Sequence, residues 1–158
     1  MLKGMKIANF AIISFAVTAP MAHVLELPNK FDLDGPLWLS VQQQLYRGWG
    51  ALFGPVEILA LLTTLLLVWM RRANPAAFRA SLVAALAYAA MLGVFFVFNA
   101  PVNLAFNSWT VADMPANWSD FRWRWEVGHA IAAGLSLVGW LALLRASFAD
   151  RKPAAKLI

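Results

Sequence analysis

Residues 51–70, ALFGPVEILALLTTLLLVWM, form an apolar stretch in which Glu57 is the only ionisable side chain. Three more apolar stretches of similar length occupy residues 7–27, 76–98 and 123–144. About 20 apolar residues in a helix cross the roughly 30 Å hydrocarbon core of a bilayer. Because lipid offers backbone groups no other partners, each stretch is predicted to be helical. The sequence therefore predicts an all-α fold, a four-transmembrane-helix bundle, with residues 1–158 forming a single integral membrane domain.

The composition supports the same class. Hydrophobic residues make up 61% and charged residues 13% of the 158, and the mean hydropathy is +0.64, far from the soluble average. The absence of cysteine excludes a disulfide framework, thiolate metal ligands and a cysteine nucleophile. In a soluble chain the net charge of +5 would suggest nucleic acid. Here membrane topology explains the charge, so we expect the chain to associate with the lipid bilayer and not with nucleic acid.

The basic residues predict the orientation. If the four segments alternate in direction, most basic residues fall on one side, namely Lys3, Lys6, Arg71, Arg72, Arg79, Arg145, Arg151, Lys152 and Lys156. Only Lys30, Arg47, Arg122 and Arg124 fall on the other side. By the positive-inside rule both termini are cytoplasmic, and we expect a multi-pass protein of the bacterial inner membrane. Residues 1–22 also resemble a signal peptide, but the apolar run continues through Leu25, so we expect it to remain as the first helix.

A short amphipathic helix is predicted between the first two membrane segments. Asp34-Gly35-Pro36 has the pattern of a helix start, and Gly48 that of a helix end. Leu37, Val41 and Leu45 recur every four residues, which places them on one face. We expect this helix to lie on the outer surface or to cap the bundle with that apolar face.

Two short motifs mirror each other in the first and last segments. They are residues 23–26, HVLE, and residues 126–129, EVGH, and they contain the only two histidines of the chain. In antiparallel helices these motifs place His23 beside His129 and the two glutamates beside each other. At 1.5 Å per residue they lie within about 10 Å of the outer ends of their helices, as does Glu57. We expect one polar layer in the outer half of the bundle and an inner half without polar groups.

Intramembrane ionisable groups are functional candidates, and a metal site is the first interpretation of this layer. His and Glu three residues apart share a helix face, so each motif can present two ligands to one ion. The predicted ligands are His23, Glu26, Glu126 and His129. Their mixture of imidazole and carboxylate suits iron, manganese or zinc better than calcium.

Three other interpretations remain open. His23 and His129 can be the axial ligands of a b-type haem. The same residues can act without metal as acid and base groups toward a lipophilic substrate. Alternatively, the layer is a hydrogen-bonded network in which Arg47, Arg122 and Arg124 pair with the glutamates.

The chain also resembles the anthrone-oxygenase-like family of small four-helix membrane proteins. The similarity rests on residues 23–28, on residues 101–103, and on Trp125 with His129. It implies an oxygenase-type activity on a hydrophobic, polycyclic or quinol-like substrate, with Glu26, Asn103, Trp125 and His129 as the matching polar residues. Ala132 stands where family members tend to have arginine. Because of this difference, the substrate and the activity can differ from those of the family.

Together these observations predict a membrane-embedded oxidoreductase. Glu57, Asn103 and Trp125 are the expected catalytic residues, beside the four predicted metal ligands, and the lipophilic substrate enters laterally. The rival hypotheses are a non-catalytic accessory subunit of a larger membrane complex and a b-type haem-binding subunit. Small residues on the third and fourth segments could also form the surface of a homo-oligomer.

Overall fold

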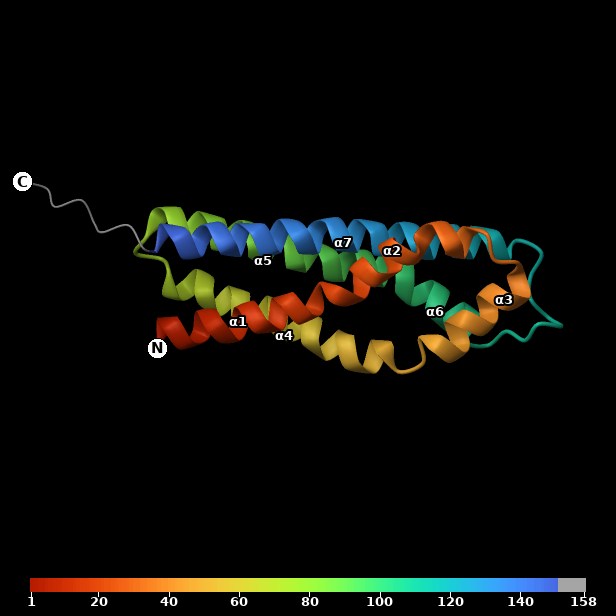
Figure 1. Cartoon of the computed structure of the whole chain (residues 1–158). Coiled ribbons are helices and arrows are strands. Elements are labelled where there is room, and N and C mark those ends of the chain that lie inside the picture. The colour runs from red at the N-terminus through yellow and green to blue at the C-terminus, as the bar shows by residue number, and fades with distance from the viewer. Residues whose placement is uncertain (151–158) are drawn as a thin grey trace, which may run out of the picture.

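The computed structural model describes residues 1–150, and most of them are helical (Figure 1). No strand occurs among these residues. Two short segments, η1 and η2, are π-helical. In chain order the elements are α1 (Leu2–Ala16), α2 (Thr18–Phe31), α3 (Gly35–Ser40), η1 (Val41–Leu45), α4 (Trp49–Met70), α5 (Pro75–Val94), η2 (Phe95–Asn99), α6 (Ala100–Phe106) and α7 (Trp118–Ala149).

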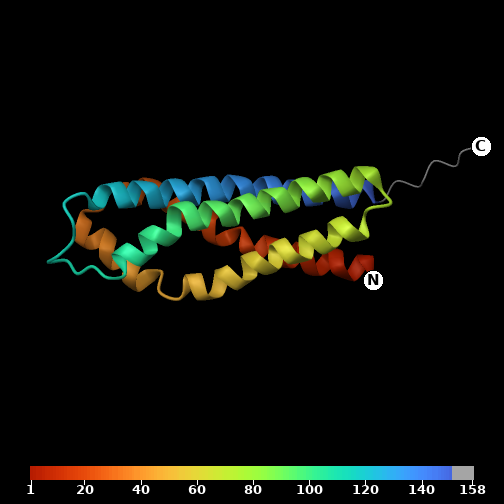
Figure 2. The same cartoon turned by 180° about the vertical axis from the view of Figure 1, so that it is seen from behind.

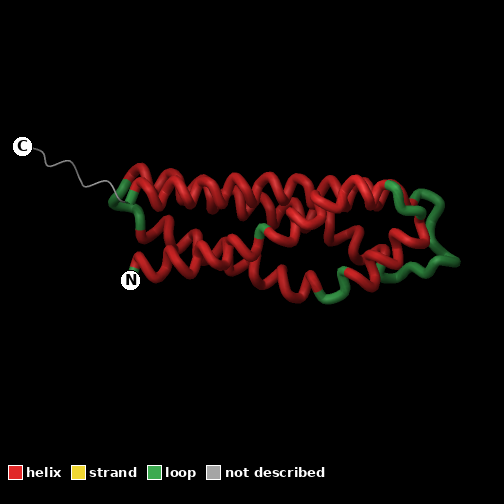
Figure 3. The backbone as a smooth tube through the Cα atoms, in the orientation of Figure 1, coloured by secondary structure: helices red, strands yellow, loops and turns green. Residues whose placement is uncertain are grey.

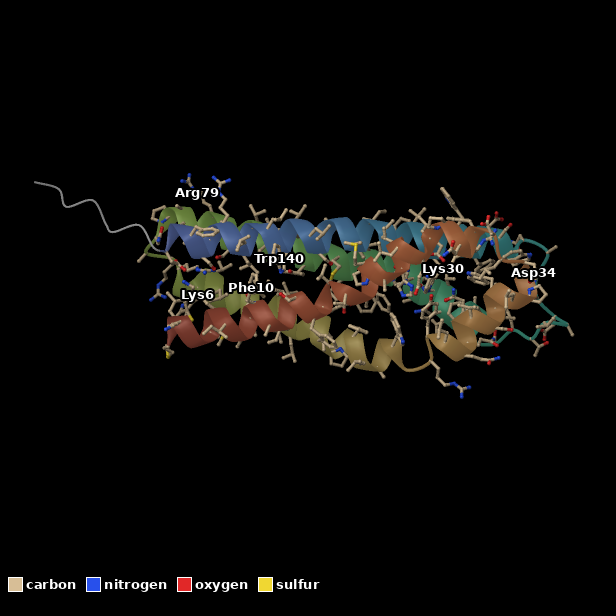
Figure 4. All side chains as sticks on the ribbon, viewed as in Figure 1. Lys6, Phe10, Lys30, Asp34, Arg79 and Trp140 are labelled. Atoms are coloured by element: carbon tan, nitrogen blue, oxygen red, sulfur yellow. The ribbon has the colours of Figure 1, made fainter. Side chains whose placement is uncertain are left out.

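Four stretches of helix are long and apolar enough to cross a membrane, namely Leu2–Phe31, Trp49–Met70, Pro75–Phe106 and Trp118–Ala149. The predicted all-α four-helix membrane bundle is therefore confirmed. The N-terminus and the end of α7 lie at the same end of the bundle (Figure 1). Lys6 and Arg79 lie at this end too, which we call the basic end (Figure 4). Three of the nine basic residues assigned to this side, Arg151, Lys152 and Lys156, lie outside the described residues.

The bundle has two layers, which are seen from opposite sides in Figures 1 and 2. Helices α5 and α7 pack along each other and form the most extensive pair. Helix α1 packs on α4 at the basic end, and α4 also contacts α5. At the other end, which we call the outer end, α2 crosses over to α7. The first span therefore touches different neighbours in its two halves.

A break at Val17 explains this change of neighbour. Helix α1 ends at Ala16 and α2 begins at Thr18 (Figure 3). Pro20 has no N–H to donate to the carbonyl of Ala16, and its ring clashes with that carbonyl in a straight helix. The sequence prediction of one continuous helix over 7–27 missed this kink.

The third span is also irregular. It passes from α5 through the π-helical η2 into α6, where Pro101 occupies the first turn. Pro101 cannot donate to the carbonyl of Val97, four residues earlier. Arg124 of α7 donates to that carbonyl instead, at 2.6 Å. The predicted pairing of Arg124 with a glutamate is therefore replaced by a bond to the backbone.

The predicted helix between the first two spans is present as α3 and η1. Asp34 caps it by accepting from the Leu37 N–H at 2.9 Å, and Gly48 adopts a left-handed φ of 85° between η1 and α4. Of the two predicted arrangements, a cap that contacts the bundle through the leucine face is not observed. Leu37 and Leu45 are exposed, whereas Trp38 and Leu39 are fully buried, because the buried face follows the aromatic cluster under α3.

The basic half of the bundle has an apolar core that includes Ile13, Leu67, Tyr88 and Leu143. It also contains polar side chains, so the expectation of an inner half without polar groups is wrong. Asn9 is 1% exposed and donates to the hydroxyls of Thr63 and Thr64 at 2.9 and 3.0 Å. The sequence does not reveal this amide's role, because an isolated asparagine in an apolar run has no local partner and its partners come from another helix.

An ion cluster closes the basic end. Arg71 is 2% exposed. It donates hydrogen bonds to Asp150 at 2.9 Å and to the Ser81 hydroxyl at 2.8 Å. Lys6 forms a second ion pair with Asp150 at 2.9 Å. The cluster joins α1, α4, α5 and the end of α7. Burial raises the pKa of Asp150, but the hydrogen bonds and charges of Lys6 and Arg71 outweigh this effect and leave the pKa below its ordinary value.

The lowered pKa gives a pH dependence of stability. The stabilisation from Asp150 is complete above its unfolded pKa, about 3.9, and is lost as the pH falls through the lower folded pKa. Asp150→Asn is expected to cost about 2 kcal/mol near neutral pH, since hydrogen bonds to charged groups are worth that much. Thermal unfolding in detergent, between pH 6 and pH 3, measures both effects.

Asp120→Asn is the matched control, because Asp120 is exposed at the opposite end of the same helix. The variant is expected to lose at most the roughly 0.3–1 kcal/mol that a carboxylate in the first turn of a helix contributes, which is less than the loss in Asp150→Asn. An Asp150→Asn protein as stable as the wild type at neutral pH would contradict the assigned role of the cluster.

Candidate functional site

A cavity of about 710 Å³ lies in the outer half of the bundle. Its walls come from α2, η1, α4, the end of α5, η2, α6 and α7. The lining is mainly aromatic and aliphatic, with a few polar groups, as in many small-molecule sites. The polar lining residues include His23, Glu57, His129, Asn99, Asn103, Gln42, Gln43 and Tyr46.

Both histidines line this cavity. Their ring centroids are 4.1 Å apart, so the predicted juxtaposition of the two mirrored motifs is observed. The Trp125 ring stands edge-on to both, with centroid distances of 4.7 Å to His23 and 4.2 Å to His129. His129 has no hydrogen bond within the described part of the chain, so its ring nitrogens are available to a molecule in the cavity.

Lys30 lies directly behind His23, away from the lining of the cavity. It is 3% exposed, and its Nζ lies 2.8 Å from His23 Nδ1 and 3.1 Å from Glu26 Oε2. Glu126 Oε2 of α7 is 3.7 Å from the same nitrogen. The ammonium therefore lies among three of the four predicted metal ligands. We call these four side chains the Lys30 cluster.

Tyr46 connects this cluster to the outer cap. Its hydroxyl donates to Glu26 Oε2, and its ring lies edge-on to His23 at 4.7 Å between centroids. Burial, together with the hydrogen bond to Glu26, raises the pKa of Tyr46 above its ordinary value. The phenol therefore stays protonated and keeps its hydrogen bond to the carboxylate over the physiological pH range.

Two asparagines hold Trp125 in the opposite wall. Asn99, at the end of η2, is 1% exposed and donates to the Trp125 carbonyl at 2.9 Å. Asn103 of α6 accepts from the Trp125 indole N–H at 2.7 Å. The irregular third span thus supplies both asparagines, in agreement with the frequent use of π-helical segments at functional sites.

A close helix contact sets the position of Asn99. A Cβ at Gly128 of α7 would lie 2.4 Å from Asn99 Oδ1 and 2.7 Å from Phe98 Cβ. Only glycine lets η2 approach α7 this closely. This contact keeps the asparagine within hydrogen-bonding distance of the Trp125 backbone.

Six of the seven predicted site residues are thereby placed in or next to the outer-half cavity. His23, His129, Asn103, Trp125 and Glu57 line it, and Glu26 lies behind it with Tyr46 and Lys30. Glu57 enters from α4 and has no ion pair or hydrogen bond among the described residues.

The seventh, Glu126, is buried behind the wall. It is 1% exposed, and neither of its oxygens has a hydrogen bond within the described residues, although Lys30 lies nearby. The predicted pairing with arginine is not observed. Arg122 instead donates to the carbonyls of Lys30 and Leu33, at 3.2 and 2.8 Å, and so satisfies the end of α2.

Sequence reasoning missed Lys30, Tyr46, Gln42 and Gln43. A signal for Lys30 exists, because residues 23, 26 and 30 recur at the spacing of one helix face. The hydropathy pattern instead places Lys30 in the outer loop, because the apolar segment ends at Leu27. Gln42 and Gln43 could not be found this way, since they face the cavity through the π-helical turn of η1.

The metal and haem predictions can be compared with this geometry. Metal–ligand bonds of about 2.0–2.2 Å would require His23, Glu26 and Glu126 to close on the point where Lys30 Nζ lies. Within the described residues, no group of three or more His, Asp or Glu side chains is arranged to hold a metal. Two axial bonds of this length would also separate the His23 and His129 rings by roughly 6 Å, more than the observed 4.1 Å. The donor set therefore does not fit either group in this conformation.

The chain was compared with known proteins. No protein-family model matches it, and neither a curated protein nor a solved structure does. The resemblance to the anthrone-oxygenase-like family therefore stays a prediction, and the function has to be argued from the site itself.

The Gly128 contact gives a prediction with a matched control. Gly128→Ala is expected to lower the melting temperature, because the new methyl group meets Asn99 and the backbone-anchored Cβ of Phe98. Gly134→Ala, on the same helix with nothing within 4 Å, is expected to leave the free energy of unfolding unchanged or to raise it by up to about 1 kcal/mol, the difference in helix propensity between Ala and Gly. Thermal unfolding in detergent compares the two. Equal stability of both variants would contradict the close η2–α7 contact.

Proposed function

We propose that the protein is a membrane-embedded oxidoreductase of the oxygenase type that acts on a lipophilic, quinol-like or polycyclic substrate in the outer-half cavity. The observation that supports this best is the placement of the chain's only two histidines side by side in the wall of that cavity. Two imidazoles that face an apolar cavity can exchange protons with a phenolic group held there.

The lining favours a flat, largely apolar molecule with a polar edge. The lining offers aromatic surface from Trp49, Phe53, Phe95 and Phe96. Its polar residues include Tyr46 beside His23, and Asn103 hydrogen-bonded to Trp125. A ring held against Trp125 would place its hydroxyl group within reach of His23 and His129. Asn103 and Glu57 supply further polar contacts to the substrate.

Access from the lipid is supported by two lining residues that are also exposed on the outside. Ile58 of α4 is 50% exposed and Phe96 of η2 is 67% exposed. Both belong to predicted membrane spans, so the cavity edge between α4 and η2 faces the hydrocarbon region. A lipophilic substrate would enter laterally between these two elements.

In this proposal the histidines provide acid–base chemistry and oxygen is the co-substrate. One imidazole removes a proton from the substrate. A quinol anion then transfers two electrons and its second proton to oxygen and leaves as the quinone with hydrogen peroxide, whereas the carbanion of an anthrone forms a C–O bond with oxygen and loses water to become the quinone carbonyl. The aromatic walls exclude water, which strengthens the hydrogen bonds formed inside. The basic end lies in the cytoplasm by the positive-inside rule, so the site faces the outer leaflet of a bacterial inner membrane.

The proposal predicts the effect of single substitutions. His129→Ala and His23→Ala are each expected to lower oxygen consumption with a short-chain quinol or an anthrone by about 100-fold or more, the usual effect of losing an acid–base group. Gln44→Ala is the matched control, because Gln44 is exposed and does not line the cavity. An oxygen electrode and proteoliposomes give the rates.

The outcome separates the rival hypotheses. Full activity in both histidine variants would contradict the proposed chemistry. Inactivity of every protein toward these substrates, together with weaker assembly of the histidine variants in native membranes, would support an accessory subunit of a larger complex. A metal or haem enzyme would show stoichiometric metal, or a Soret band, that His23→Ala/His129→Ala removes.

A further inference from the structure

Lys30 is a buried cation for which the proposed function has not yet assigned a role. It lies on the last turn of α2, at the outer end of the bundle (Figure 4). Its side chain is 4% exposed, and its ammonium also lies over the Tyr46 ring at 4.8 Å and the Trp125 ring at 5.0 Å. Such a buried charge is costly unless its partners are arranged around it.

Those partners are the side chains that would otherwise hold a metal. His23 Nδ1, Glu26 Oε2 and Glu126 Oε2 lie 2.8, 3.1 and 3.7 Å from Lys30 Nζ. A divalent ion bound by the same three atoms would need to occupy nearly the same point, because its bonds are about 2.0–2.2 Å long. The ammonium and a metal ion therefore exclude each other in this cluster.

The donors and acceptors of these groups determine which ring nitrogen of His23 carries the proton. An ammonium has three donors and no acceptor, so His23 Nδ1 must accept the 2.8 Å bond with its lone pair. A neutral imidazole with Nδ1 as acceptor has its proton on Nε2. His23 can thus offer the cavity an N–H donor. His129, without a hydrogen bond among the described residues, keeps a free lone pair.

We propose that Lys30 is a positioning residue that occupies the cation position of the cluster and makes His23 the hydrogen-bond donor toward the substrate, which leaves His129, with a free lone pair, as the proton acceptor. This inference rests on the proposed function for its catalytic meaning. The arrangement of Lys30 and His23 can be tested without any substrate.

Histidine-selective ¹⁵N NMR of the full-length protein in detergent tests the arrangement directly. The chain has two histidines, so two sets of imidazole signals are expected, and His129→Ala assigns them. We expect His23 to be neutral with the proton on Nε2, and to lose this single tautomer in Lys30→Met. Retention of the pattern in Lys30→Met, or a wild-type His23 protonated on Nδ1, would overturn the proposal. If Lys30→Met does not fold, the wild-type spectrum alone still shows whether the proton of His23 is on Nε2.

Cobalt binding tests whether Lys30 fills a cation position. Lys30→Ala is expected to bind Co²⁺ stoichiometrically, with visible d–d absorption, whereas the wild type binds none at this cluster. Lys30→Ala/His23→Ala should lose the binding. Stoichiometric Co²⁺ in the wild type that requires His23, or no binding by Lys30→Ala, would overturn the assignment.

Activity then links the inference to the reaction. Lys30→Met is expected to lower kcat at least 10-fold, and Lys30→Arg to restore part of it, since Arg keeps the charge and the donors. If the NMR and cobalt predictions fail, the role of Lys30 is refuted but the proposed function is not. If both predictions succeed but His129→Ala keeps its activity, the proposed function is refuted and the arrangement of Lys30 and His23 stands.

Discussion

The ion pair between Lys30 of α2 and the carboxylates around it is the interaction on which the outer half of the protein depends. An ammonium within an apolar bundle is tolerated only where opposite charges and hydrogen-bond acceptors surround it. Glu26 comes from the same helix and Glu126 from α7, so the pair also joins the two helices that present the histidines. Breaking it would leave a buried charge without its partner.

A second constraint is the irregularity of the spans. Pro20 and Pro101 each remove a backbone hydrogen bond inside a helix, and in lipid the freed carbonyls need other partners. Arg124 supplies one such partner at Val97, and each of the kinked segments turns one face to the cavity. The helices of the basic half are regular and pack around an apolar core, whereas the broken helices of the outer half surround the cavity.

The fold could be predicted from the sequence because segment length and hydropathy alone decide it. The meeting of His23 and His129 could also be predicted, since antiparallel helices bring mirrored motifs together. Other features depend on tertiary contacts that leave no local pattern. The burial of Lys30 depends on α2 extending to Phe31, and the inward turn of Gln42 depends on a π-helical segment. Asn9 likewise finds its threonine partners only across the bundle.

We expect the outer-half cavity to bind a lipophilic molecule beside the two histidines. Photolabelling with a diazirine derivative of a short-chain quinone, followed by peptide mass spectrometry, locates the bound molecule. Labels are expected on the cavity-lining parts of residues 42–58 and 91–109, and they should be removed by excess unlabelled quinone and reduced in Trp49→Ala but not in Trp69→Ala. Labels confined to lipid-facing positions such as Leu62 and Leu66, and unaffected by competitor, would contradict it.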